Sequence, residues 1–234
     1  MPASQMVRAR LARRLPDPAE TVPDACVAAA GVEEIGVMPV EPDDGGARTS
    51  MASEGKLMLC LHDRQVRFVG IGVWAANHYA PGITELFTTK DKDLFLPPEP
   101  ENLLQAWEAC EDAGLELYVG SEPLDRPRDL VLARAVVERR ALTRASDGDM
   151  LHVDLTLVMA GFDFETVWQE RRTFLVDGVD VPVARLTHIV ESKSAAGRLK
   201  DLLFLETHRT MLRELEERHR AREKGTEKGT EEAT

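Results

Sequence analysis

The chain has 234 residues, of which 43% are hydrophobic and 30% charged, and its formal net charge is −12. This length and apolar fraction suffice for one packed domain with tails. The negative charge argues against a protein whose whole surface binds nucleic acid, although a local basic patch is compatible with it. No apolar run approaches the roughly 18 residues that a transmembrane helix needs, so we expect no membrane partner and a cytoplasmic protein. Three unclustered cysteines favour neither a disulfide framework nor a zinc site.

The two ends of the chain differ in composition from its middle. Residues 1–52 open with an arginine-rich stretch and continue with Pro, Ala, Gly and acidic residues without periodicity, which predicts a disordered extension. A transit peptide and a translation start at Met51 are the alternatives. Residues 223–234 repeat Lys-Gly-Thr-Glu and predict a disordered tail. We therefore expect the folded domain to span residues 53–222.

The first segments of this middle region predict a strand, a glycine-rich turn and a helix. Leu57–His62 is expected to end a helix, and Val66–Val69 to form a buried strand. Gly70 and Gly72 follow, and a helix begins near Val73. In this arrangement backbone N–H groups face an anion such as phosphate. A tight turn without a ligand is the alternative interpretation.

Two aspartates come next, at the start of an apolar run. Asp91 and Asp93 lie two residues apart, and the run ends at Pro97. On a strand, such residues point to the same face about 7 Å apart, so both carboxylates present oxygens to one point. A proton or a divalent cation relieves their repulsion, and oxygen ligands suit Mg²⁺. The pair predicts a metal site, with a solvated turn or strand end as the alternative.

Two helical patterns follow. Residues 100–113 carry apolar side chains at helical spacing, and Gly114 ends the pattern. Trp107 is expected in the core. Residues 126–144 form the second pattern, with six arginines against two acidic residues. The arginines predict either a solvated face or a local basic surface for RNA or phosphate.

The next segment is a strand with a carboxylate near its middle. Residues 151–158 alternate apolar and polar side chains, and Asp154 lies among the polar ones. Asp154 belongs either to a solvated face of an antiparallel sheet or to a metal site as its third carboxylate.

The C-terminal part predicts a hairpin and a long helix. Residues 172–176 and 179–183 flank an Asp-Gly pair, the favoured two-residue hairpin turn. A long final helix is expected from about Gly197, and Lys193, Arg198 and Asp201 mark its entry.

Several of these segments, between about residues 55 and 217, together resemble a known family. They are Phe68–Gly72, Thr88–Leu94, His152–Asp154, Val183–Leu186 and Ser192–Leu202. Their combination is similar to the nucleotidyltransferase superfamily, in particular to the small bacterial group that contains abortive-infection-type toxins. The last segment, with its Lys, Ala-Gly-Arg and Lys-Asp-Leu run, is the most distinctive.

The resemblance implies a fold, a reaction and a set of site residues. The fold is α+β (α/β), with a mixed β-sheet flanked by helices and a helical C-terminal element. The reaction moves a nucleoside monophosphate from an NTP such as ATP to a hydroxyl on tRNA or protein, with two Mg²⁺ ions as cofactors. In a toxin–antitoxin pair, a cognate antitoxin would be a further partner. The implied metal ligands are Asp91, Asp93 and Asp154, with Lys193 as the fourth catalytic residue, and the implied nucleotide-binding residues are Gly70, Gly72, Lys193, Arg198 and Asp201.

Within this set, the resemblance implies that Asp201 orients Lys193 or Arg198 through a charged hydrogen bond, a helix cap being the alternative. The glycine motif departs from the family, because Ile71 follows Gly70 where Gly or Ser is usual. This departure leaves open a catalytically inactive module of the same fold that binds a nucleotide or a partner protein.

Overall fold

The computed structural model describes residues 45–80 and 87–231. One compact unit runs from Ser50 to Thr234, and the elements discussed below lie in it except for the first residues of the first helix. The expectations for residues 1–44 lie outside the described residues, and the predicted domain limits stay predictions.

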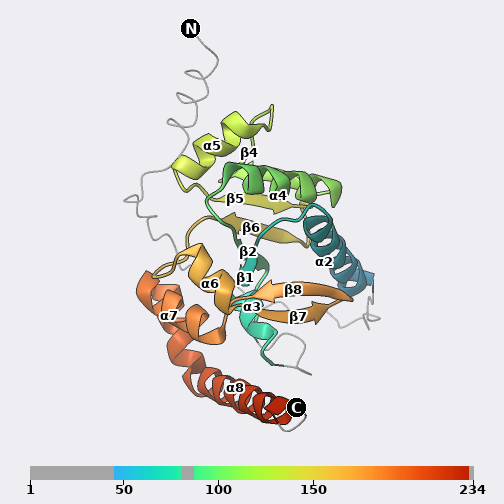
Figure 1. Ribbon diagram of the computed structural model, residues 1–234. Helices are drawn as coiled ribbons and strands as arrows, with labels where there is room; N and C mark the ends of the chain where they lie inside the picture. The colour runs from blue at the N-terminus through green and yellow to red at the C-terminus, as the bar shows by residue number, and fades with distance from the viewer. Residues whose placement is uncertain (1–44, 81–86, 232–234) are drawn as a thin grey trace, which may run out of the picture. The chain divides into compact units, whose positions relative to one another are not determined.

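Helices and strands follow one another along the chain as labelled in Figure 1. They are α2 (Gly45–Asp63), β1 (Val69–Ile71), α3 (Gly72–Asn77), β2 (Asp91–Phe95), α4 (Pro100–Asp112), β3 (Glu116–Val119), β4 (Glu122–Pro123), α5 (Leu130–Glu138), β5 (Thr143–Ser146), β6 (His152–Thr156), α6 (Phe164–Glu170), β7 (Arg172–Val176), β8 (Val179–Val183), α7 (Leu186–Ala196) and α8 (Leu199–Glu231). None of the described helices combines the length and the apolar character that crossing a bilayer requires.

In the described part of the chain, eight strands form one mixed sheet. Their order is β4-β3-β5-β6-β2-β1-β8-β7. The pairs β2–β6 and β1–β8 are parallel, and the other neighbours are antiparallel. The predicted architecture, a mixed sheet flanked by helices with a helical C-terminal element, is confirmed.

The helices pack on the sheet through apolar faces. Helix α3 contacts β1 and β2, α4 contacts β3 and α5, and α7 contacts α3 and α8. Leu94 and Leu155, on the central strands, are fully buried. Trp107 of α4 is also fully buried, as predicted, and its indole Nε1 donates a hydrogen bond of 3.1 Å to Thr143 Oγ1 on β5. Leu94, Leu155 and Thr143 are in register, so these buried side chains cover the face of the central strands that Trp107 packs against.

The first strand begins later than the sequence predicts. Val66–Val69 was expected to be the strand, whereas β1 starts at Val69. Asn102 explains the shift, because its side-chain amide accepts from the backbone N–H of Arg67 (2.8 Å) and donates to the carbonyl of Arg67 (3.0 Å). The backbone groups that a neighbouring strand would pair are thus taken by a side chain of α4.

The predicted helix over residues 126–144 is wrong at both ends. Helix α5 covers only Leu130–Glu138, and Asp129 begins it by accepting hydrogen bonds from the backbone N–H groups of Val131 and Leu132. The chain turns at Arg140, where φ is +49°, and the following residues form β5. A continuous basic helical surface is therefore absent from this segment, and its last arginine, Arg144, lies in the sheet.

The hairpin and the C-terminal helix agree with the sequence prediction. Asp177 and Gly178 adopt φ values of +50° and +82° between β7 and β8, as the two-residue turn requires. Gly197, at φ +62°, ends α7 and separates it from α8. Because glycine reaches this left-handed conformation without a steric penalty, the chain can reverse there and bring α8 back against α7.

Candidate active site

A row of chemically active side chains crosses the sheet at one level. Asp93 of β2 pairs in register with Asp154 of β6, and Asp154 pairs in turn with Arg144 of β5. Neighbouring strands lie about 4.8 Å apart, so residues paired in register project side by side on the same face. Asp91 lies two residues before Asp93 on the same strand. Three carboxylates from two strands are thereby brought together with one guanidinium.

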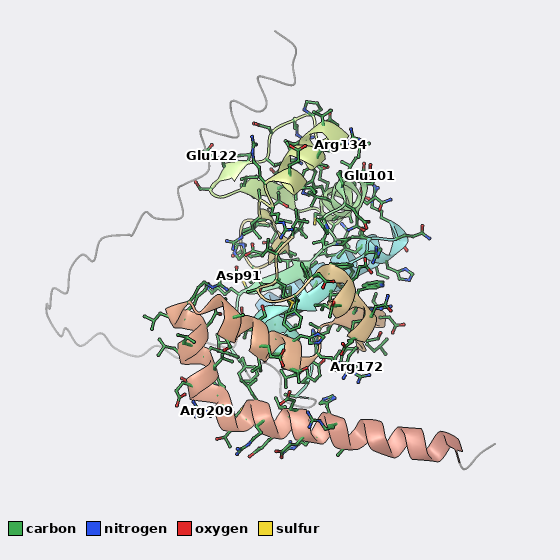
Figure 2. The ribbon with its side chains drawn as sticks, turned by 60° about the vertical axis from the view of Figure 1, so that its left-hand side comes forward. Asp91, Glu101, Glu122, Arg134, Arg172 and Arg209 are labelled. Carbon is green, nitrogen blue, oxygen red and sulfur yellow. The ribbon has the colours of Figure 1, made fainter. Side chains whose placement is uncertain are left out.

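The same face carries a cavity of about 700 Å³ that collects most of the predicted site residues. Figure 2 shows Asp91, at the start of β2, near the C-terminal helices, which form the other wall. The predicted residues that line the cavity are Gly72, Asp91, Asp93, Asp154, Lys193, Arg198 and Asp201. Gly70 does not line it. The two segments that carry the carboxylates and the C-terminal segment that carries the cations therefore meet at one place.

Asp93 has the most perturbed carboxylate of the site. Burial, and next the charge of Asp154, raise its pKa from 3.8 to about 6, and Lys193 partly opposes this rise. Within the described part of the chain, no hydrogen bond or ion pair satisfies its side chain. A shielded carboxylate beside a second one binds a cation or a proton readily.

The two glycines of the predicted phosphate motif have different packing roles. Gly72 adopts φ +72°, and a Cβ at this position would lie 2.1 Å from Asp93 Oδ2. A Cβ on Gly70 would meet the ring of Trp74 at 2.7 Å. Gly72 therefore allows the backbone at the start of α3 to lie directly against the Asp93 carboxylate, whereas Gly70 allows Trp74 to pack on β1.

The cationic wall is held together by one buried acid. Asp201 is 2% exposed, and it accepts hydrogen bonds from Lys193 Nζ (2.9 Å) and Arg198 Nε (2.6 Å). Burial raises the pKa of Asp201, but these two hydrogen bonds outweigh it and hold the pKa below its ordinary value. Lys193 Nζ also lies 4.9 Å from the centre of the Phe204 ring, a cation–π contact. The predicted contact of Asp201 with Lys193 or Arg198 is thus present with both.

Arg144 also lines this cavity. It was not predicted as a site residue because the sequence pattern placed residues 126–144 in a helix. Its Nε donates to Asp154 Oδ1 at 2.6 Å, and a terminal nitrogen donates to Asp154 Oδ2 at 2.9 Å. The same terminal nitrogen lies 3.5 Å from Asp91 Oδ1. Thr143 and Ala145 are buried on either side of the partly exposed Arg144. This alternation with a period of two is typical of a strand, and it is the pattern that could have placed Arg144 on the sheet.

Arg144 also affects which carboxylate oxygens of the cavity are free to bind a metal ion. Among the described residues, no group of three or more His, Cys, Asp or Glu side chains is arranged to hold a metal ion. The three predicted ligands, Asp91, Asp93 and Asp154, line one cavity, but in this conformation both oxygens of Asp154 accept hydrogen bonds from Arg144.

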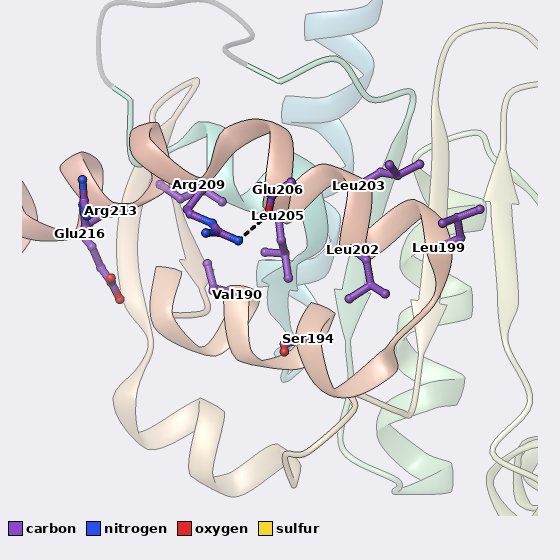
Figure 3. Close-up of a pocket in the computed structure, with 11 residues that line it drawn as sticks. Val190, Ser194, Leu199, Leu202, Leu203, Leu205, Glu206, Arg209, Arg213 and Glu216 are labelled. Carbon is purple, nitrogen blue, oxygen red and sulfur yellow. Dashed lines mark hydrogen bonds and ion pairs between the residues drawn. The ribbon is translucent and has the colours of Figure 1, made fainter.

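A second hollow, between α7 and α8, differs in character (Figure 3). Its volume is about 600 Å³, and it is lined mainly by leucines of α8 together with Val190 and Ser194 of α7. Its charged residues include Glu206 and Arg209, which pair with each other. No aspartate lines it, so the catalytic candidates belong to the sheet cavity.

Comparison with known proteins adds little to this geometry. No protein-family model matches the chain, and no curated protein matches it. Among solved structures, it is similar to the solution structure of the antibiotic-resistance factor ANT(2'')-Ia, with 15% sequence identity and a TM-score of 0.46 over 79% of this chain and 98% of that one. Because a likeness of this size says nothing about activity, a functional conclusion has to come from the residues of the cavity.

Proposed function

We propose that this protein is a divalent-metal-dependent nucleotidyltransferase, which moves a nucleoside monophosphate from an NTP to a hydroxyl group of tRNA or protein. One observation carries the proposal: Asp91, Asp93 and Asp154 line the same cavity as Lys193 and its partners on the C-terminal helices. Carboxylates opposite a fixed ammonium group suit a metal–triphosphate substrate, in which phosphates bridge the cation and the lysine.

The carboxylates fit a divalent cation. Asp93 is shielded from water and unpartnered among the described residues, and the opening at Gly72 leaves its Oδ2 without a side chain above it. Oxygen donors of this type are the ones that Mg²⁺ prefers, so Asp91 and Asp93 would hold it, and Asp154 would add to them. When bound, Mg²⁺ neutralises charge on the phosphates and lowers the pKa of an attacking hydroxyl.

The C-terminal wall supplies charge for the triphosphate. Lys193 is 14% exposed on its side chain, and Asp201 fixes its ammonium group at the cavity. Arg198 and Lys200 also line the cavity, and both are exposed. A fixed lysine acts as a compact point charge for phosphate oxygens, and an arginine can bind two of them at once. These residues would bind and orient the triphosphate.

The reaction exchanges one bond to phosphorus for another. The acceptor hydroxyl gives its proton to a carboxylate of the cavity or to water, and its oxygen forms a bond to the α-phosphorus. The bond from that phosphorus to the pyrophosphate oxygen breaks. Pyrophosphate leaves with the electron pair of that bond.

Leu142 and Val158 line the cavity with partly exposed apolar side chains, which suit van der Waals contact with a base or another flat group of a substrate.

A catalytically inactive module of the same fold is the second candidate. The observation in its favour is the bidentate pair of Arg144 and Asp154, because this positively charged partner opposes the binding of a cation by the same carboxylate. Such a module would bind a nucleotide or a partner protein without turnover.

Label transfer separates the two candidates. The protein is incubated with Mg²⁺ or Mn²⁺, each α-³²P-labelled NTP, and either total tRNA or a cell lysate. We expect label in a macromolecule with the wild type and with the control Asp180→Asn, which removes an exposed carboxylate of β8, and none with Asp93→Asn. Thermal stabilisation by an NTP without label transfer supports the inactive module instead.

The toxin role requires its own test. Expression of the wild type in bacteria is expected to stop growth, whereas Asp93→Asn is expected to leave growth intact. Co-expression of the neighbouring gene then shows whether a cognate antitoxin exists. Normal growth with the wild type contradicts a toxin role and leaves the transferase assay unaffected.

A further inference from the structure

Arg144 is fixed by the carboxylates of the cavity. Its guanidinium forms two hydrogen bonds to Asp154 and lies within ion-pair distance of Asp91. The charge of Asp93 acts on the same guanidinium. The group that holds Arg144 in place is therefore the same group that would bind a divalent cation.

The guanidinium and a divalent cation compete for Asp154. A Mg²⁺ ion binds carboxylate oxygen at about 2.0–2.1 Å. Both oxygens of Asp154 already accept hydrogen bonds, of 2.6 and 2.9 Å, from the positively charged fork of Arg144. Two cations on one carboxylate repel each other, so Arg144 and a divalent cation compete for Asp154.

The two partners differ in their freedom to move. The side chain of Arg144 is 38% exposed, whereas that of Asp154 is 12% exposed and lies near the middle of β6. A long side chain near solvent can change rotamer at little cost, but a short one on a central strand cannot follow it. Arg144 is therefore the partner that leaves.

We infer that Arg144 is a displaceable internal cation, which occupies the carboxylate site of the metal-free protein and sets the concentration of divalent cation at which that site fills. This inference rests on the proposed function, since it concerns the same three carboxylates. Arg144 is thus a positioning residue that acts through Asp154. Without a metal ion, the single positive charge of Arg144 is shared between Asp91 and Asp154, and on metal binding Arg144 gives up its pair with Asp154.

Direct metal binding tests the inference without any measurement of turnover. Mn²⁺ is titrated into the full-length protein in the absence of nucleotide, and the free ion is followed by electron paramagnetic resonance. We expect Arg144→Gln to bind Mn²⁺ about tenfold more tightly than the wild type, the size of effect that loss of one competing charge-assisted pair gives. Arg144→Lys keeps the charge and loses the bidentate fork, so we expect an increase of several-fold.

Two controls show whether the effect passes through Asp154. Arg134→Gln removes the same charge from an exposed position on α5 (Figure 2) outside the cavity lining, and it is expected to bind Mn²⁺ as the wild type does. In the double variant Arg144→Gln/Asp154→Asn, the gain in affinity is expected to vanish. Circular dichroism confirms that each variant is folded before it is titrated.

Unchanged or weaker Mn²⁺ binding by folded Arg144→Gln overturns the inference, and so does a gain that persists without Asp154. If the wild type binds no Mn²⁺ but the Arg144→Gln variant does, this result supports the inference. Failure of the proposed function would be detected in a different experiment, the NTP assay, as absence of label transfer. The Mn²⁺ titration and the NTP assay therefore test the two proposals independently.

Discussion

Replacement of Asp93 by asparagine is expected to stabilise the metal-free protein. The ionised carboxylate is half-buried next to Asp154, and desolvation and the charge of Asp154 raise its pKa to about 6. The folded state therefore binds this proton more tightly than the unfolded state does. Above pH 6 the fold carries an unfavourable charge, which the neutral amide of asparagine removes without a large change in shape.

The size of the effect follows from the pKa difference. A rise from 3.8 to about 6 corresponds to about 3 kcal/mol above pH 6, because each pKa unit is worth about 1.4 kcal/mol. Desolvation of the asparagine amide offsets part of this increase in the free energy of unfolding. We therefore expect a net increase of about 2 kcal/mol. For a folded unit of this size, that raises Tm by roughly 4–8 °C.

The pH dependence identifies the cause. Through this group, the wild type loses stability as the pH rises from about 4 to about 6, whereas Asp93→Asn does not. The gain in stability of Asp93→Asn over the wild type is therefore largest at pH 8 and is lost as the pH falls to about 4.

The assay is thermal unfolding in EDTA at several pH values, followed by circular dichroism. Asp180→Asn, at an exposed position on β8, is the control, and it is expected to change stability by less than about 0.5 kcal/mol. Added Mn²⁺ should stabilise the wild type and not Asp93→Asn, because only the former keeps the ligand. A lower Tm for Asp93→Asn at pH 8, or an equal gain at pH 4 and pH 8, would refute this reasoning.

Two further substitutions test the surroundings of the cavity. Gly72→Ala is expected to cost at least about 2 kcal/mol in urea unfolding and to abolish Mn²⁺ binding, because φ is +72° and the new methyl would lie 2.1 Å from Asp93 Oδ2; near-native stability would show that the backbone there tolerates a side chain. Asp201→Asn is expected to cost about 2 kcal/mol at pH 7, chiefly through the shielded partner Lys193 rather than the exposed Arg198. Because the folded pKa of Asp201 is depressed, its stabilisation is present above the unfolded pKa and lost as the pH falls through the folded one. A gap between wild type and variant that stays constant from pH 7 to pH 3 would contradict this assignment.

Local sequence patterns predicted the elements that local forces determine. The alternation around Asp154 and the placement of Asp91 and Asp93 on a strand agree with β6 and β2. The Asp-Gly pair gave the hairpin, and the leucine pattern gave the final helix. These features depend on side-chain period and turn chemistry, which are properties of a few neighbouring residues.

Where a segment's partner is distant in the chain, the local pattern misled. Residues 126–144 have a helical pattern and many arginines, but the last of them pair with β3 and β6 in the sheet. Val66–Val69 has a strand pattern, but the amide of Asn102 takes the backbone groups of Arg67. In both cases a tertiary contact outweighed local propensity.

The sequence by itself identified the acidic and basic candidate residues of the site, and it placed Asp91, Asp93 and Asp154 on strands. Only the tertiary structure decided that Asp93, Asp154 and Arg144 stand in one row, because strands that are distant in the chain reach their register only when their hydrophobic faces pack on a common core. The same register makes Arg144 the partner of Asp154, and the residue types alone do not show this pairing.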